Sequence, residues 1–310
     1  MSATLPGAET STHTYATVGD RELQLLLHLP TQPPHPPRRS TPLIVWCHGS
    51  AFFGGAHLLG NPPAFSCPSY ISKGYAIAQI DHRSSTEPGG LFPAGVHDVK
   101  AAVRYLRHLA QSDAALGLDP ERIASWGASS GGYYSSILGI LSSPTAPDVE
   151  GVRASSLEGT VGTHLDVSSS VCCAVDYFGP SDFLQMDAHS ERDKGHKLVH
   201  DGPESPESSF MGFPIQEQPS AVQRANTAAY ASADCPPMLI VHGDEDKLVP
   251  HHQSRLLHEA LVAAGAPDVT LYIVAGGGHG DGFDEDAELQ RLTEDFLERH
   301  LKGAGGAAAL

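Results

Sequence analysis

The amino-acid sequence predicts an α/β fold with a mostly parallel central sheet. Short apolar runs of strand length recur along the chain, and uninterrupted runs of this kind are typical of strands that are covered on both faces. Segments with apolar residues at helical spacing stand between these runs, and regular alternation of strand and helix indicates a parallel sheet. Two short alternating segments open the chain, so we expect an antiparallel hairpin before the parallel strands.

The strands follow one another in a clear order. The hairpin is expected from residues 15–18 and 23–29, because Val18-Gly19-Asp20 between them carries turn-forming residues. Residues 31–42 are rich in proline and predict a stiff, exposed connector. Six further strands are predicted at LIVWCHG (43–49), YAIAQIDHR (75–83), RIASW (122–126), VCCAVDYF (171–178), PMLIVHG (237–243) and VTLYIVAG (269–276).

Helices are predicted between and after these strands. The strongest pattern covers residues 97–111, where Val99, Val103 and Leu106 share one face and charged residues lie opposite. Apolar residues also recur at helical spacing after the third parallel strand, at residues 133–141, and again at 254–265 and 287–301.

One segment breaks the alternation. Residues 187–226 are polar and rich in Pro, Ser and His, and they are too many for an ordinary connection. We expect a lid-like insertion before the seventh strand, with a plain insertion as the alternative. Residues 1–310 are expected to form a single domain that includes this insertion, and residues 303–310 are expected to be a flexible tail.

Composition excludes several function classes. The net charge is −17 and no block of Lys or Arg is present, so nucleic acid and membranes are not expected partners. No apolar run approaches 18 residues, and the first residues lack the pattern of a signal peptide. The five cysteines have no metal-type spacing, which favours free thiols and a cytoplasmic location. The sequence leaves open whether the chain forms a homo-oligomer.

The stretch SWGASSGG, residues 125–132, carries the first chemical signal. It places Ser129 in G-x-S-x-G between a predicted strand and a predicted helix. A serine at such a tight turn is pushed out of the sheet, and glycine neighbours leave room for that conformation. Ser129 is therefore the candidate nucleophile, with Gly127 and Gly131 allowing the sharp turn.

A serine nucleophile needs a histidine base and a carboxylate that orients the histidine. His279 follows the last predicted strand among several glycines, and the strand before it is followed by Asp244 and Asp246. Because sites in parallel sheets gather at the carboxyl ends of strands, these groups are expected to meet Ser129. Position alone does not decide whether Asp244 or Asp246 orients the histidine. No His-x-x-x-His pattern with a helical Glu appears, so no metal and no cofactor are expected.

The chain resembles the α/β-hydrolase superfamily, and within it esterases of the bacterial feruloyl-esterase-like and hormone-sensitive-lipase-like groups. The matching stretches are HGSAFFGG, FPAGVHDVKAAVRYLR, LDPERIASWGASSGG, VDYFGPSDFLQMD, HGDEDKLVP and GGGHG, in this order. The resemblance implies an α/β-hydrolase fold. It also implies Asp246 as the acid of the triad Ser129, Asp246 and His279, and turn capping for Asp244.

The resemblance implies an oxyanion hole as well. Related esterases carry HGGG where this chain has His48-Gly49-Ser50-Ala51, and their backbone N–H groups hold the oxyanion. The corresponding donors here are the N–H groups of Ser50, Ala51 and Ser130. Since Ser50 and Ala51 replace glycines, the backbone donors survive the replacement if φ stays negative. Apolar walls for the substrate are expected from the aromatic residues Phe52, Phe53, Tyr133 and Phe178.

These observations favour a serine carboxylic-ester hydrolase that acts on short-chain or aromatic acyl esters of small molecules. Two alternatives stay open. One is a serine peptidase or amide hydrolase on the same fold, and the other is a catalytically inactive binding protein.

Overall fold

The computed structural model describes residues 4–31, 41–193 and 198–303. Eight strands form one sheet in the order β1-β2-β4-β3-β5-β6-β7-β8. The first two strands make an antiparallel hairpin, and the pairs from β4 to β8 are all parallel. This arrangement confirms the predicted α/β-hydrolase fold with its mostly parallel sheet.

The strands lie where the apolar runs predicted them, with shifted ends. They are β1 (Ala8–Val18), β2 (Arg21–Pro30), β3 (Thr41–Cys47), β4 (Ala76–Ile80), β5 (Leu118–Ala128), β6 (Cys173–Tyr177), β7 (Met238–Gly243) and β8 (Val269–Val274). β3 ends before His48-Gly49 and β4 ends before Asp81. The polar residues that close several runs therefore belong to loops at the carboxyl ends of the strands.

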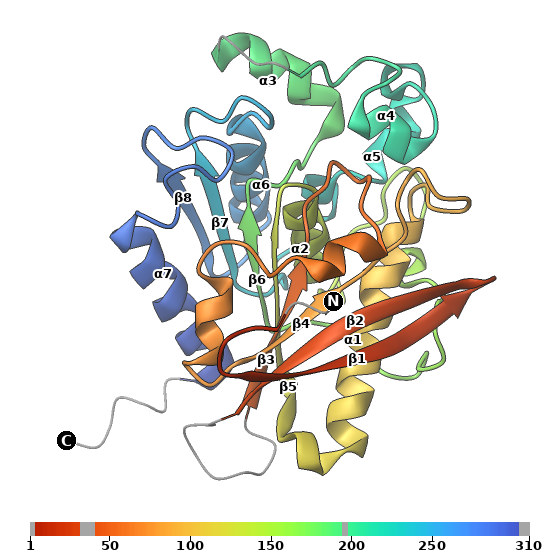
Figure 1. The fold of residues 1–310 in the computed structure, drawn as a ribbon. Coiled ribbons are helices and arrows are strands. Elements are labelled where there is room, and N and C mark those ends of the chain that lie inside the picture. Colours follow the sequence, from red (N-terminus) through yellow and green to blue (C-terminus); the bar gives the residue numbers. More distant parts are fainter. Residues whose placement is uncertain (1–3, 32–40, 194–197, 304–310) are drawn as a thin grey trace.

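Helices cover both faces of the sheet (Figure 1). α1 (Ala94–Ser112), α2 (Ser130–Ile140) and α6 (His252–Ala263) bury apolar residues in one core cluster. α7 (Ala287–Leu297) and the short helix η2 (Cys67–Ile71) pack in a second cluster on the opposite face. The helix predicted at residues 97–111 is confirmed as α1. None of the described helices is long and apolar enough to cross a membrane.

The segment 187–226 lies between β6 and β7, before the seventh strand as expected. It holds most of α3 (Met186–Asp193) together with α4 (Pro206–Met211) and α5 (Pro219–Gln223), which lie beyond the carboxyl ends of the strands (Figure 1). The ring of Phe210 in α4 stacks on Phe52 with 4.2 Å between ring centroids, and Phe210 is 1% exposed. The segment is docked through this contact, and its role as a lid stays a prediction.

Two other expectations concern the chain outside the core. The predicted connector falls largely on residues 32–40, and the predicted tail on residues 304–310, and both lie outside the described residues. All five cysteines are free thiols, as the sequence indicated.

Candidate active site

Ser129 occupies the tight turn between β5 and α2. Its backbone has φ 58° and ψ −127°, a left-handed conformation that is rare for a residue with a side chain. The conformation is held by two hydrogen bonds: Ser129 N–H donates to Tyr177 O at 2.9 Å, and Tyr133 N–H donates to Ser129 O at 3.1 Å. Strained backbone of this kind concentrates at functional sites.

The neighbouring glycines make this turn sterically possible. A Cβ atom at Gly127 would lie 2.1 Å from the carbonyl oxygen of Gly131, and one at Gly131 would lie 2.1 Å from the carbonyl oxygen of Cys47. Neither contact can be relieved by a flexible side chain, because both partners are backbone atoms. The glycines of G-x-S-x-G are thus required by the close approach of β3, β5 and α2.

His279 and Asp246 meet across the loops that follow β8 and β7. Nδ1 of His279 lies 2.7 Å from Oδ2 of Asp246. The Asp246 side chain is fully buried, whereas that of His279 is 22% exposed. With Nδ1 engaged by the carboxylate, Nε2 of His279 is the nitrogen left for a substrate or a nucleophile.

The protein holds Asp246 as a carboxylate. Its Oδ1 accepts hydrogen bonds from the N–H groups of Leu248 at 2.8 Å and Val249 at 3.0 Å. Burial raises the pKa of this carboxyl, but the hydrogen bonds and charges of His242 and His279 outweigh burial and hold the pKa below its ordinary value. An ionised carboxylate is the form that orients a neutral imidazole and stabilises an imidazolium.

Asp244 has a different place. It is exposed, and its Oδ1 accepts a hydrogen bond from the N–H of Gly276 at 2.7 Å. This bond ties the loop after β7 to the loop after β8. Asp244 braces the turn, while Asp246 contacts the histidine.

A cavity of about 470 Å³ opens beside Ser129. Ser129, His279, Ser50, Ala51 and Phe178 all border it. Its further walls come mostly from the segment after β3 and from the ends of β3 and β4, namely Trp46, Leu58, Leu59, Asn61, Pro62, Ala64, Phe65 and Gln79. The structure therefore brings the candidate nucleophile, the candidate base and part of the expected oxyanion loop to one cavity.

The oxyanion loop differs from expectation in two respects. The N–H of Ser50 donates to Oγ of Ser130 at 2.9 Å, so this donor is already engaged. Ala51 and Phe52 have φ of 52° and 66°, so the condition of a negative φ is not met at Ala51. The loop turns sharply here with side chains present. The N–H of Ser130 lies in the first turn of α2, where helix N–H groups have no intrahelical acceptor.

Three of the four expected substrate-wall residues lie elsewhere. Phe52 and Tyr133 are 2% and 0% exposed and pack edge to face in the core, where Phe52 also stacks on Phe210. Phe53 is 39% exposed and borders a separate cavity, which it shares with residues such as Arg21 and Glu87. Phe178 does line the cavity, with its ring centroid 4.4 Å from that of His279. The left-handed backbone at Ala51 and Phe52 redirects the side chains of Phe52 and Phe53, whereas Tyr133 is one of the buried residues of α2.

Sequence reasoning missed most of the cavity wall. Leu58 and Leu59 lie in the short helix η1 (Ala56–Gly60) and Phe65 lies in the turn after it, and these pieces are too short for a periodic pattern to signal the orientation of their side chains. Gln79 was visible as one polar residue inside the apolar run YAIAQI. That interruption was the available signal.

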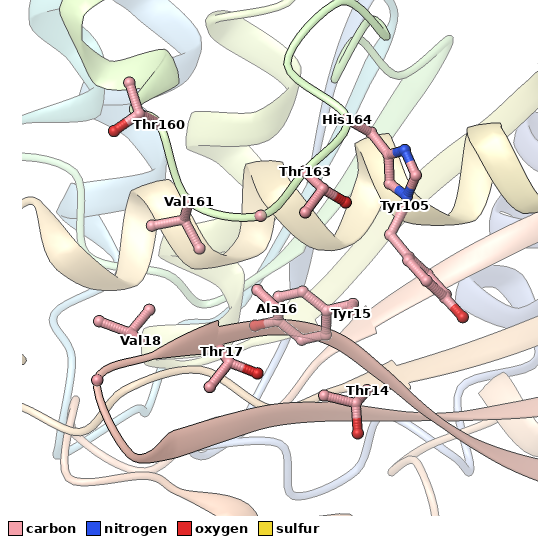
Figure 2. Close-up of a pocket in the computed structure, with 12 residues that line it drawn as sticks. Thr14, Tyr15, Ala16, Thr17, Val18, Tyr105, Thr160, Val161, Thr163 and His164 are labelled. Carbon is pink, nitrogen blue, oxygen red and sulfur yellow. The ribbon is translucent and has the colours of Figure 1, made fainter.

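A larger cavity of about 650 Å³ lies between residues 14–19 at the end of β1, Tyr105 of α1 and residues 160–164 (Figure 2). Threonines, Tyr105 and His164 line it, together with small apolar residues. Its lining contains no carboxylate and no serine nucleophile, so the smaller cavity at Ser129 is the candidate active site. Among the described residues, no group of three or more His, Cys, Asp or Glu side chains is arranged to hold a metal ion.

Comparison with known proteins identifies the family and the fold of the chain. The BD-FAE family model matches residues 29–261, which is most of the chain. The chain is 27% identical to esterase LipC of Mycobacterium tuberculosis over 244 residues, which cover 79% of this chain and 54% of LipC. The chain thus spans about half the length of this relative.

Two solved structures share the fold over nearly the whole chain. A truncated carbohydrate esterase from gut microbiota superposes with a TM-score of 0.79 at 29% identity, covering 96% of this chain and 99% of that one. Esterase 2 of Thermogutta terrifontis, phosphonylated by sarin, superposes with a TM-score of 0.70 at 24% identity and covers 96% of both chains.

Proposed function

Since the chain belongs to the BD-FAE family, we propose that it is a serine carboxylic-ester hydrolase whose nucleophile is Ser129. The observation that carries this proposal is the 2.7 Å contact between His279 and the buried, ionised Asp246, at a cavity that Ser129 also borders. A hydroxyl, an oriented imidazole and a carboxylate are the groups that acyl transfer requires.

The reaction proceeds in two halves. Nε2 of His279 accepts the proton of the Ser129 hydroxyl while Oγ attacks the ester carbonyl carbon. As the tetrahedral intermediate collapses, the C–O bond to the leaving group breaks, the leaving oxygen takes the proton from His279 and departs as the alcohol, and an acyl-enzyme remains. Water then attacks the acyl carbon, gives its proton to His279, and releases the acid as Ser129 recovers its proton.

The oxyanion is held by the backbone N–H groups of Ala51 and Ser130. Both residues flank the nucleophile, one in the loop after β3 and the other directly after Ser129. The Ser130 hydroxyl contributes indirectly, because it accepts from the N–H of Ser50 and so fixes the loop that presents Ala51. Preorganised donors of this kind lower the barrier because they need no reorganisation when charge develops.

Short or aromatic acyl esters in free solution are the proposed substrates. Aromatic and aliphatic side chains from Leu58, Phe65 and Phe178 line the cavity and suit an apolar group. Val199 is the only large apolar side chain that is exposed in the described part of residues 187–226. A surface of this kind gives little apolar area for docking on lipid.

The test compares the wild type with Ser129→Ala. We expect Ser129→Ala to unfold at nearly the same urea concentration as the wild type, and to lose kcat on p-nitrophenyl butyrate by about 10⁴-fold or more. Within the wild type, kcat/KM should be highest on the acetate or butyrate ester or on an aromatic acyl ester, and lowest on the palmitate. Faster cleavage of a matched anilide than of the ester would point to an amide hydrolase instead, and full activity of Ser129→Ala would reject the nucleophile.

A further inference from the structure

The cavity at Ser129 has one deeply buried polar residue away from the triad. Gln79 in β4 is 3% exposed and lines the cavity, where its neighbours include Trp46 and Leu58. A buried amide among apolar walls is costly unless its polar atoms are paired. The partners of Gln79 therefore indicate what its remaining atom is for.

A line of hydrogen bonds crosses three strands to reach this amide. Nε2 of Gln79 lies 2.8 Å from Nε2 of His28 in β2, and Nδ1 of His28 lies 2.8 Å from Oγ1 of Thr10 in β1. Thr10 and His28 are directly opposed in the β1–β2 ladder, and His28 is fully buried. Gln79, His28 and Thr10 are called the amide relay below.

The direction of the relay follows from the chemistry of its members. Burial lowers the pKa of His28 to about 4, so the ring is neutral near pH 7. A glutamine amide nitrogen only donates, so Nε2 of His28 accepts from it and Nδ1–H donates to Thr10. Among the described residues, no side chain or backbone group donates to Oε1 of Gln79. Since Gln79 lines the cavity, its carbonyl oxygen is left as an acceptor there.

The amide lies well away from the ester carbonyl. Gln79, Trp46 and Trp126 stand side by side in register on β4, β3 and β5, and Ser129 lies three residues beyond Trp126. Strands about 4.8 Å apart and a rise of roughly 3.3 Å per residue place the Cα atoms of Gln79 and Ser129 about 14 Å apart. An acetyl group on Ser129 does not span this separation, whereas a longer acyl group approaches the amide with its far end.

We propose that Gln79 is a specificity-determining residue, which accepts a hydrogen bond from a hydroxyl at the far end of the group bound in the Ser129 cavity, with His28 and Thr10 as positioning residues. This inference rests on the proposed ester hydrolysis at Ser129. Trp46 is in register with Gln79 on the neighbouring strand and borders the cavity, and Phe65 borders the same cavity, so a hydroxyaryl group carried on an acyl chain is the chemical class that fits.

The experiment uses three matched esters and the full-length chain. They are methyl 3-(4-hydroxyphenyl)propanoate, its 4-methoxy analogue and the unsubstituted phenyl ester. We expect the wild type to favour the hydroxyl ester over the unsubstituted one by about tenfold in kcat/KM, the effect of one buried hydrogen bond. In Gln79→Leu this ratio should fall to about one, because the acceptor is gone.

Two further variants separate positioning from packing. Thr10→Val removes the end of the relay far from the cavity, so it should lower the hydroxyl preference and raise the relative rate on the methoxy ester, because the amide is then free to rotate. A merely structural role of Thr10 leaves both ratios unchanged. Gln24→Leu is the matched control, because Gln24 lies on β2 outside the cavity lining, and it should keep the wild-type ratios. If Gln79→Leu fails to fold, Thr10→Val decides.

Each remaining outcome overturns the inference. If the wild type has equal kcat/KM on the hydroxyl and unsubstituted esters, Gln79 does not determine specificity. The same conclusion follows if Gln79→Leu keeps the hydroxyl preference. Preference of the wild type for the methoxy ester shows that the amide presents its NH₂ group and that the acceptor assignment is wrong. Failure of the proposed function itself is distinguishable, because it abolishes turnover of p-nitrophenyl acetate by the wild type.

Discussion

Replacing Asp246 with asparagine separates the role of its charge from the role of its shape. Asparagine keeps one carbonyl oxygen, which can go on accepting the two N–H groups of Leu248 and Val249 that bond to Oδ1 at 2.8 and 3.0 Å. Its NH₂ group then faces Nδ1 of His279, which now bonds to Oδ2 at 2.7 Å. A donor at this position stabilises the imidazole tautomer that carries its proton on Nε2, and this tautomer cannot accept the proton of Ser129.

Two magnitudes follow, and they differ enough to be told apart. Loss of one buried hydrogen bond to a charged group reduces the free energy of unfolding by about 1.5–3 kcal/mol, which leaves most domains folded. The wrong tautomer reduces kcat by about 10⁴-fold, as in serine hydrolases that use the same triad, and this corresponds to about 5 kcal/mol of barrier. Asp246→Asn is therefore expected to be folded and nearly inactive.

The assay measures kcat on p-nitrophenyl butyrate and the urea unfolding transition, with Asp244→Asn as the matched control. Asp244 is exposed, and within the described chain its side chain accepts a hydrogen bond only from the N–H of Gly276, which an asparagine carbonyl can keep. Its kcat should stay within about twofold of the wild type. A larger loss in Asp244→Asn than in Asp246→Asn, or a loss below tenfold in Asp246→Asn, would refute the assignment of the triad acid.

Three further predictions test the oxyanion loop, the insertion at residues 187–226 and the loss of folding stability at acid pH. Ser130→Ala should lower kcat by about tenfold by freeing the N–H of Ser50, whereas Ser135→Ala on the same helix should change stability alone; equal kcat in both variants would contradict this. Phe210→Ala should reduce the free energy of unfolding in urea by about 3–4 kcal/mol, and a loss below 1 kcal/mol would instead indicate a loosely held lid. Burial raises the pKa of Asp246, but His242 and His279 lower it by more, so the folded pKa lies below the unfolded value of about 3.9. The stability that the ionised Asp246 contributes is therefore complete above about pH 3.9 and is lost as the pH falls through the folded pKa. The difference in unfolding free energy between wild type and Asp246→Asn should therefore shrink below about pH 4, and a difference that grows there would contradict the sign.

The fold and the placement of Ser129, His279 and the pair Asp244 and Asp246 were accessible from the sequence for a physical reason, whereas the choice of Asp246 over Asp244 came from the family resemblance. Each residue follows an apolar run, and the carboxyl ends of parallel strands converge at one edge of the sheet. The glycines around Ser129 signal a turn whose backbone leaves no space for Cβ atoms, and the contacts of Gly127 and Gly131 bear this out.

The walls of the cavity were not accessible in the same way. Phe52 and Phe53 are neighbours in an irregular loop, and their directions depend on the left-handed backbone at Ala51 and Phe52, which no periodicity reveals. The bond between Ser50 and Ser130 joins residues 80 positions apart and depends on the packed geometry. Long-range side-chain contacts of this kind follow from the tertiary structure rather than from local pattern.

The most direct test of the central claim is peptide mass mapping after titration with paraoxon, which phosphorylates a serine activated by a neighbouring base. We predict one diethylphosphoryl group per chain on the peptide that contains Ser129, with hydrolysis of p-nitrophenyl butyrate falling in proportion to labelling. The same treatment should leave Ser129→Ala unlabelled. A label on another residue, or undiminished turnover by fully labelled protein, would contradict the assignment of Ser129 as the nucleophile.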